Sequence, residues 1–257
     1  MGKKKNVKKV LLFIVEGKSD EKALTAILES LFSPMHFHTI VAKGDITAQY
    51  HPNRNTNIVN KVKDFANNNL DVFTPSDLAT ICLLTDLDGC FIPDSQVTSH
   101  EKKKNVYSRE RIYAQNVEHQ IETKNFKARN LKILSTRKYL TIRSIKIPFV
   151  CYYMSCNLED VFQGEQNYPD SEKSALADQI ADTYQRDIEG FVHFLNTQYP
   201  LSEQDYSLSW QYPQLENHSL ERHTNFLIFL LDHKNYLSEE ALKICNELQT
   251  EKELSEE

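Results

Sequence analysis

The sequence lacks several features that would place it in a large class of proteins. No apolar run approaches the roughly 18 residues that a membrane-spanning helix needs, which excludes a transmembrane protein. The start, MGKKKNVKK, is basic, but it is followed by neither the apolar length nor the small-residue cleavage site of a signal peptide. The five cysteines form an odd number without a CxxC pair, which argues against a disulfide scaffold and a zinc ribbon. We therefore expect a cytoplasmic protein.

The net charge of −6 conceals an uneven distribution of charge along the chain. Residues 101–146 contain 13 Lys and Arg against 4 Glu, a net charge of +9, whereas residues 147–257 carry a net charge of −15. A basic block inside an acidic protein is typical of a surface that binds a polyanion such as nucleic acid. A solvated, partly flexible insertion has the same composition, so both interpretations stay open at this point.

The hydrophobic pattern predicts strands that alternate with helices. Continuous apolar runs predict four buried strands, at 9–15, 37–42, 79–85 and 145–154. Helical spacing of apolar residues predicts helices at 19–32, 56–69, 172–196, 219–232 and 238–249, with a polar helix near 108–124 and a short one opening at 157–160. Pro148 in the last strand indicates an edge position or a bulge.

This order of elements predicts an α/β fold with a mainly parallel, Rossmann-like sheet flanked by helices. We expect the sheet to belong to a catalytic domain at 1–165, which carries the basic insertion at about 91–144. The remaining residues, 166–257, are expected to form a helical C-terminal appendage.

Carboxylates follow each of the four predicted strands. Ligands of an open parallel sheet bind outside the carboxyl ends of its strands, so these side chains are expected to converge. Acids without matching Lys or Arg need a positive partner, and Mg²⁺ or Mn²⁺, which prefer oxygen ligands, commonly supply it. The sequence therefore predicts a site for one or two divalent ions. The residues at the strand ends are Glu16, Asp20, Asp45, Asp86, Asp88, Glu159 and Asp160.

Two ordered motifs in this arrangement resemble a known family. A strand, the segment VEGKSD and a helix are followed by a strand that ends in TDLDG. This pattern resembles the Toprim domain shared by topoisomerases, bacterial primases, ribosomal-RNA maturases and the overcoming-lysogenization-defect nucleases. The resemblance covers residues 8–90 and extends more loosely to about residue 163, and it implies a Toprim-like sheet.

The resemblance also implies functions for individual carboxylates. Glu16 matches the family glutamate, and Asp86 and Asp88 match its metal-binding DxD pair. Asp20 lies where the nuclease branch has a second acidic residue, and Glu159 lies where that branch has a later carboxylate. Asp160 is an alternative to Glu159. The catalytic set implied is thus Glu16, Asp86, Asp88 and Glu159, with Asp20 as a further metal ligand.

Other features of the chain separate the members of this family. A topoisomerase needs a much longer chain, a primase needs a zinc-binding module, and no P-loop GxxxxGK[ST] occurs here. A stand-alone protein of this kind resembles metal-dependent nucleases of DNA or RNA, including maturases and anti-phage defence enzymes. Some of these act with a separately encoded ATPase or another defence protein. A non-catalytic Toprim-like module that binds nucleic acid or a partner is the competing class.

The basic block follows the DxD strand, so we expect it to begin at the catalytic edge of the sheet. Such a block is expected to supply sequence-independent phosphate contacts. Lys18, close behind Glu16, is a further candidate, for which a solvent-facing turn lysine is the alternative interpretation. The candidates in the block are Lys102, Lys103, Lys104, Arg109, Arg111, Lys124, Lys127, Arg129, Lys132, Arg137 and Lys138.

Overall fold

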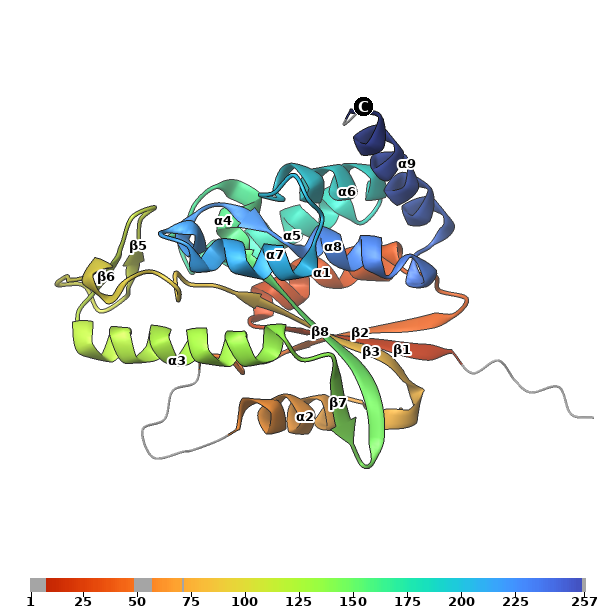
Figure 1. The fold of residues 1–257 in the computed structure, drawn as a ribbon, viewed down its shortest axis with the longest axis horizontal. Helices are drawn as coiled ribbons and strands as arrows, with labels where there is room; N and C mark the ends of the chain where they lie inside the picture. Colours follow the sequence, from red (N-terminus) through yellow and green to blue (C-terminus); the bar gives the residue numbers. More distant parts are fainter. Residues whose placement is uncertain (1–7, 49–56, 71, 256–257) are drawn as a thin grey trace, which may run out of the picture.

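A computed structural model describes residues 8–48, 57–70 and 72–255, so the basic start at 1–7 lies outside the described residues. A central sheet runs through the molecule and is covered by helices on both faces (Figure 1). Its strand order is β2-β1-β3-β8-β7, in which the first four strands are parallel. The strands are β1 (Lys9–Val15), β2 (Phe37–Lys43), β3 (Leu78–Asp86), β7 (Tyr139–Ile142) and β8 (Ile145–Ser155).

The predicted α/β class and the parallel arrangement of the four predicted strands are confirmed. The sequence did not reveal β7, which forms an antiparallel hairpin with the first residues of β8. Pro148 pairs with β7, and β3 joins β8 only from Phe149 onward, so the proline lies where β8 has a neighbour on one side. A short strand, β9 (His223–Thr224), extends the sheet by pairing with the end of β8.

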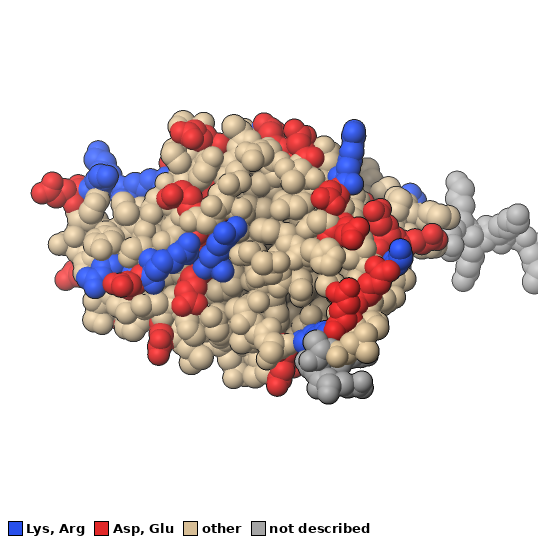
Figure 2. All heavy atoms as spheres, turned by 90° about the horizontal axis from the view of Figure 1, so that it is seen from above, with Lys and Arg blue, Asp and Glu red and all other residues tan. Residues whose placement is uncertain are grey.

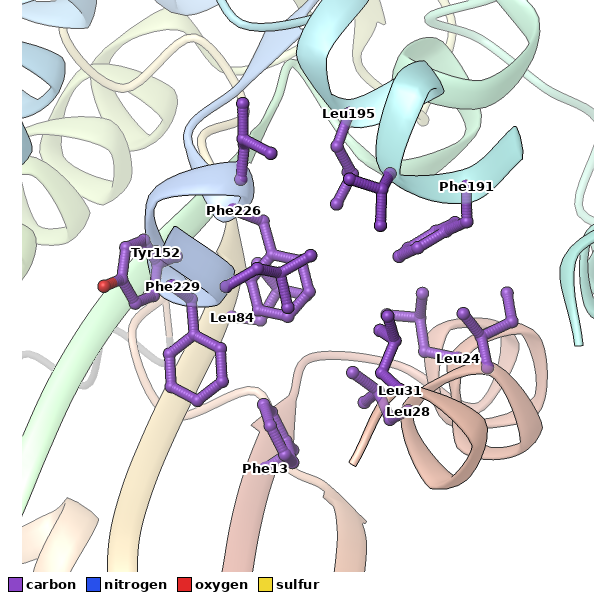
Figure 3. Packing of buried hydrophobic residues seen from close by; sticks show 14 of the residues in the cluster. Phe13, Leu24, Leu28, Leu31, Leu84, Tyr152, Phe191, Leu195, Phe226 and Phe229 are labelled. Atoms are coloured by element: carbon purple, nitrogen blue, oxygen red, sulfur yellow. The ribbon is translucent and has the colours of Figure 1, made fainter. Parts of the chain in front are cut away.

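Helices from both halves of the chain cover one face of the sheet (Figure 1). Phe13 of β1 meets Phe229 edge to face, with ring centroids 5.4 Å apart (Figure 3). Phe13 also stacks on Phe32, with ring centroids 5.3 Å apart. This aromatic centre joins the sheet to helices that are far apart in sequence. They are α1 (Lys18–Leu31), α4 (Leu158–Gln163), α5 (Lys173–Tyr184), α6 (Ile188–Thr197), α8 (Phe226–Asp232) and α9 (Glu239–Ser255).

The helical C-terminal region therefore differs from the expected appendage. Its helices share one hydrophobic core with β1, β3 and β8, and β9 belongs to the main sheet. The physical reason is that a parallel sheet buries both faces, and α1 alone does not cover this one. The helix expected at 172–196 is divided into α5 and α6, because Gln185–Asp187 interrupt it.

The opposite face is covered by α2 (Ile58–Asn68) and α3 (Val117–Ser135), while α7 (Tyr206–Gln211) packs beside β8. The expected polar helix at 108–124 is wrong in position, since α3 begins and ends later. Residues before it form a small second sheet of β4 (Val97–Ser99), β6 (Ile112–Ala114) and β5 (Val106–Tyr107). The basic insertion is thus folded. Short 3-10 turns lie at Pro75–Asp77, Asp94–Gln96, Tyr212–Gln214, His218–Leu220 and Lys234–Tyr236.

Within the described ranges, no helix combines the length and the apolar character that crossing a membrane requires.

Candidate functional site

The parallel strands bring the predicted carboxylates to one edge of the main sheet. Glu16 directly follows β1, Asp86 is the last residue of β3, and Asp88 follows two residues later. Glu159 lies in the first turn of α4, behind the end of β8. Because these strands are adjacent and point the same way, their carboxyl ends form one acidic cluster, as the pattern predicted.

Glu16 is held firmly in this cluster, with 12% of its side chain exposed. Its Oε1 accepts a hydrogen bond of 2.9 Å from the Thr47 hydroxyl and a second one from the Thr85 hydroxyl. Burial raises the pKa of Glu16 to about 6. The positive charge of Lys127 offsets part of this effect, and repulsion from Asp88 adds to it. Glu16 is therefore a carboxylate that exchanges a proton close to neutral pH.

Lys127 of α3 reaches into the acidic cluster with only 2% of its side chain exposed. Its Nζ lies 3.0 Å from Glu16 Oε1 and 2.6 Å from Asp88 Oδ2. Burial alone would lower the pKa of Lys127, but Asp88 and Glu16 raise it well above its ordinary value. Two expectations are corrected: the cluster contains a basic partner, and Lys127 is not on an exposed phosphate-binding surface.

Asp86 lies beside this ion pair without a comparable partner. None of the residues that the structure describes donates a hydrogen bond to its carboxylate. Burial raises the pKa of Asp86 well above its ordinary value, and repulsion from Asp20, Glu16 and Asp88 adds to the effect. Asp86 is thus the carboxylate for which the protein itself supplies the least compensation.

Asp20 connects this cluster to a second group of charges. Its Oδ2 accepts a hydrogen bond of 2.8 Å from the Gly17 amide and so caps α1. Burial raises the pKa of Asp20, and the Gly17 hydrogen bond only partly offsets this, while Glu159 adds repulsion. Glu159 is buried, and its Oε1 lies 2.7 Å from Lys173 Nζ of α5.

Glu159 and Asp160 have different partners in this fold. Both oxygens of Asp160 accept hydrogen bonds from the Arg109 guanidinium, at 2.5 Å and 2.7 Å. Asp160 therefore anchors the small sheet to α4, and Glu159 is the one of the two that faces Asp20. The guanidinium of Arg109, a predicted phosphate-binding residue, is thus paired with Asp160, although 43% of its side chain is exposed.

The turn after β3 depends on its glycine. Asp88 and Gly89 adopt left-handed conformations, with φ angles of 49° and 62°. A Cβ atom on Gly89 would lie 2.5 Å from a methyl carbon of Leu220. Glycine is thus required here, because the backbone has a positive φ angle and no space is left for a Cβ atom. The turn places the Asp88 carboxylate beside Lys127. Gly17, in contrast, has an extended backbone that other residues also adopt.

The basic residues are distributed differently from the continuous strip that the sequence predicted. Lys104 pairs with Asp170 at 2.7 Å, and Lys124 pairs with Asp94 at 2.6 Å. Seen from the layer of C-terminal helices, blue and red side chains alternate at the left end of the molecule (Figure 2). The predicted basic residues that are at least partly exposed and form no ion pair with described residues are Lys18, Lys102, Lys103, Arg111, Arg129, Lys132, Arg137 and Lys138.

Three residues of the site had no assigned function in the sequence analysis. Thr85 immediately precedes the DxD pair, so its position on β3 was a usable signal for a contact with Glu16. Thr47 follows β2, two residues after Asp45, so its place behind a strand was a similar signal, whereas Lys173 gave none, because it reaches Glu159 from the start of α5. In the described parts of the chain, no three His, Cys, Asp or Glu side chains already converge as a complete metal-ligand set.

Comparison of the chain with family models, curated proteins and solved structures gives no match.

Proposed function

We propose that the chain is a divalent-metal-dependent nuclease that hydrolyses phosphodiester bonds of DNA or RNA at a Toprim-like acidic site. The observation that carries this proposal is the position of Asp86. It ends a central strand without a hydrogen-bond donor from the described residues, while burial and three neighbouring carboxylates raise its pKa. A carboxylate in this setting is stabilised by an additional positive charge.

The donor set fits Mg²⁺ or Mn²⁺, because hard divalent ions prefer carboxylate oxygens. Glu16, Asp86 and Asp88 would hold such an ion, with Asp20 and Glu159 beside them. When bound, it would supply positive charge for the phosphate oxygens and lower the pKa of a water molecule. Lys127 already compensates part of the negative charge of the cluster, so the remaining charge is concentrated at Asp86.

The protein's own groups suit the handling of a proton at this position. Glu16 would either help to hold the ion or accept a proton from an attacking water, and both roles need the ionised form that a pKa of about 6 gives it at neutral pH. The Thr47 and Thr85 hydroxyls fix its orientation. The Lys127 ammonium holds Glu16 and Asp88 in place and offsets part of the negative charge that would otherwise repel a phosphodiester group.

Lys127 also supports a second candidate function. Because its ammonium neutralises Glu16 and Asp88, the cluster has an internal counter-charge and a purely structural explanation is available. The protein would then be a non-catalytic module that binds nucleic acid or a protein partner, among them a separately encoded ATPase. Metal-dependent cleavage distinguishes the two candidates.

The decisive test is the loss of labelled single-stranded and double-stranded DNA and RNA in Mg²⁺ or Mn²⁺, with EDTA as the control. Glu16→Gln is expected to lower the cleavage rate by orders of magnitude while circular dichroism stays native, because it removes the ionised carboxylate that either role needs. Glu110→Gln, an exposed acid on the small sheet, serves as the matched control and is expected to cleave like wild type. Absence of metal-dependent cleavage by the wild type would support the binding module, and cleavage by Glu16→Gln at the wild-type rate would exclude Glu16 from the reaction.

A further inference from the structure

A second hollow lies away from the acidic cluster. A cavity of about 880 Å³ opens between the end of α3, the middle of β8 and α7. Its volume is in the range of about 300–1,000 Å³ that is typical of small-molecule sites. No residue of the acidic cluster lines it, and Ser135 in its wall lies eight residues after Lys127 on α3, about 12 Å along the helix axis.

One wall of this cavity consists of aromatic side chains in fixed positions. The Tyr206 hydroxyl and the Trp210 Nε1 both donate hydrogen bonds to the Cys151 carbonyl, at 2.9 Å and 3.0 Å. Tyr206 also meets Tyr152 edge to face, with ring centroids 5.4 Å apart. Tyr206 is the partly exposed ring of the three, because Tyr152 and Trp210 are buried behind the cavity surface. Since these contacts fix Tyr206 before any ligand arrives, stacking of a flat ligand on it costs little entropy for ordering the ring.

One rim of the cavity carries uncompensated positive charge. Lys132, Arg137 and Lys138 are exposed there, and none forms an ion pair with a residue in the described part of the chain. Lys132 Nζ lies only over the Phe91 ring, 5.8 Å from its centroid. Asp205 and Asp232 also line the cavity, and their carboxylates can accept hydrogen bonds from exocyclic amino groups, although Asp205 Oδ1 already accepts one from the Leu208 amide. The cavity thus combines an aromatic wall with a cationic rim and an anionic rim.

We propose that this cavity binds a nucleoside phosphate, with the base against Tyr206, in front of the buried Trp210, and the phosphate at Arg137 and Lys138. A base has the flat apolar face and the amino groups that the wall and the acidic rim fit, and a phosphate fits the cationic rim. This site goes beyond the proposed function, because binding here involves none of the acidic cluster. The nucleoside phosphate comes either from a free nucleotide or from one residue of a nucleic-acid strand.

The fluorescence of Trp210 reports directly on ligand binding at this site, because Trp210 is the only tryptophan in the chain. Its fluorescence is titrated in EDTA, where no cleavage occurs, with each of the four nucleoside monophosphates and separately with short single-stranded oligonucleotides. Ribose 5-phosphate, which lacks the base, is the ligand control. Arg137→Gln/Lys138→Gln removes the phosphate partners, and Arg186→Gln/Lys243→Gln is the control, because it removes an exposed arginine and an exposed lysine that do not line the cavity.

We expect saturable quenching by at least one nucleotide or oligonucleotide, and much weaker binding of ribose 5-phosphate. Arg137→Gln/Lys138→Gln is expected to raise the Kd at least about tenfold for each cationic side chain that no longer binds the phosphate, whereas the control pair leaves it unchanged. Binding of mononucleotides identifies a free nucleotide as the source, and binding of oligonucleotides alone identifies a strand.

Three results would overturn the proposal: no quenching at millimolar ligand, equal binding of ribose 5-phosphate, or an equal Kd in wild type and Arg137→Gln/Lys138→Gln. A dimer in sedimentation that covers Trp210 and dissociates in that variant would also overturn it, because a second copy of the chain would then fill the cavity. None of these results depends on cleavage, so the failure of this site and the failure of the nuclease function are separate outcomes.

Discussion

Replacing Lys127 by Met tests the electrostatic account of the acidic cluster. The change nearly keeps the length of the side chain, of which 2% is exposed, but it removes the ammonium that lies between Glu16 and Asp88. Breaking a buried ion pair by removing one partner costs about 3–5 kcal/mol. Because 31% of the Asp88 side chain is exposed to solvent, we expect a smaller loss, about 2–4 kcal/mol in the free energy of unfolding without metal.

Divalent metal is expected to reverse much of this loss. Without Lys127 the carboxylates repel one another more strongly and attract a cation more strongly, so Mg²⁺ should stabilise the Lys127→Met variant more than the wild type. We expect the additional gain to exceed about 1.4 kcal/mol, which corresponds to roughly tenfold tighter binding. The assay is urea unfolding in EDTA and in Mg²⁺.

Lys124→Met is the matched control for this experiment. Lys124 is also 2% exposed on α3, but it pairs with Asp94, outside the acidic cluster. We expect it to lower stability without changing the stabilisation by Mg²⁺. The reasoning would be refuted if Lys127→Met were as stable as wild type in EDTA, or if both variants gained the same stability from Mg²⁺.

Three further predictions concern the surroundings of the site. Gly89→Ala is expected to cost about 2 kcal/mol or more in urea unfolding, since a positive φ alone costs roughly 1–2 kcal/mol and the Cβ would overlap Leu220; a fully stable variant would contradict this. Burial lowers the pKa of His223 from 6.5 to about 4, so the folded protein binds fewer protons than the unfolded chain in this window and loses stability as pH falls. The loss from about pH 7 to pH 5 should be about 2 kcal/mol, and His223→Gln should remove that part of the pH slope. The variant Lys18→Gln/Lys102→Gln/Lys103→Gln/Arg111→Gln should lower the affinity for nucleic acids of many sequences alike. The slope of log K against log salt concentration should fall by roughly 0.7–0.9 for each phosphate that is no longer neutralised, so an unchanged slope would exclude these residues from nucleic-acid binding.

The sequence was sufficient to predict the buried strands, because each contains an uninterrupted run of apolar residues. β1 is such an element, since every residue from Val10 to Val15 is buried. The edge of the sheet at which the carboxylates meet could be predicted from the parallel pairing of the strands alone. The apolar pattern of the strands was therefore enough to bring Glu16 and the DxD pair together correctly.

The position of α3 was beyond sequence reasoning because its buried face is partly polar. Gln120, Lys124, Lys127 and Asn130 are buried on it, so the apolar period that marks a helix is weak. A lysine becomes buried only where distant carboxylates compensate its charge, and Glu16 is 111 residues away in the chain. The shared core of the C-terminal helices was hidden for a related reason, since helical periodicity marks an apolar face but not the surface that it covers.

The most direct test of the account is the binding of Mn²⁺ to wild type and to Asp86→Asn, followed by electron paramagnetic resonance of the free ion. The central claim is that the acidic strand ends form a divalent-cation site in which Asp86 is the least compensated ligand. We predict that wild type binds one or two ions, and that Asp86→Asn binds them at least about tenfold more weakly while its fold and metal-free stability are retained. Equal Mn²⁺ binding by the two proteins, or none by wild type, would contradict the claim.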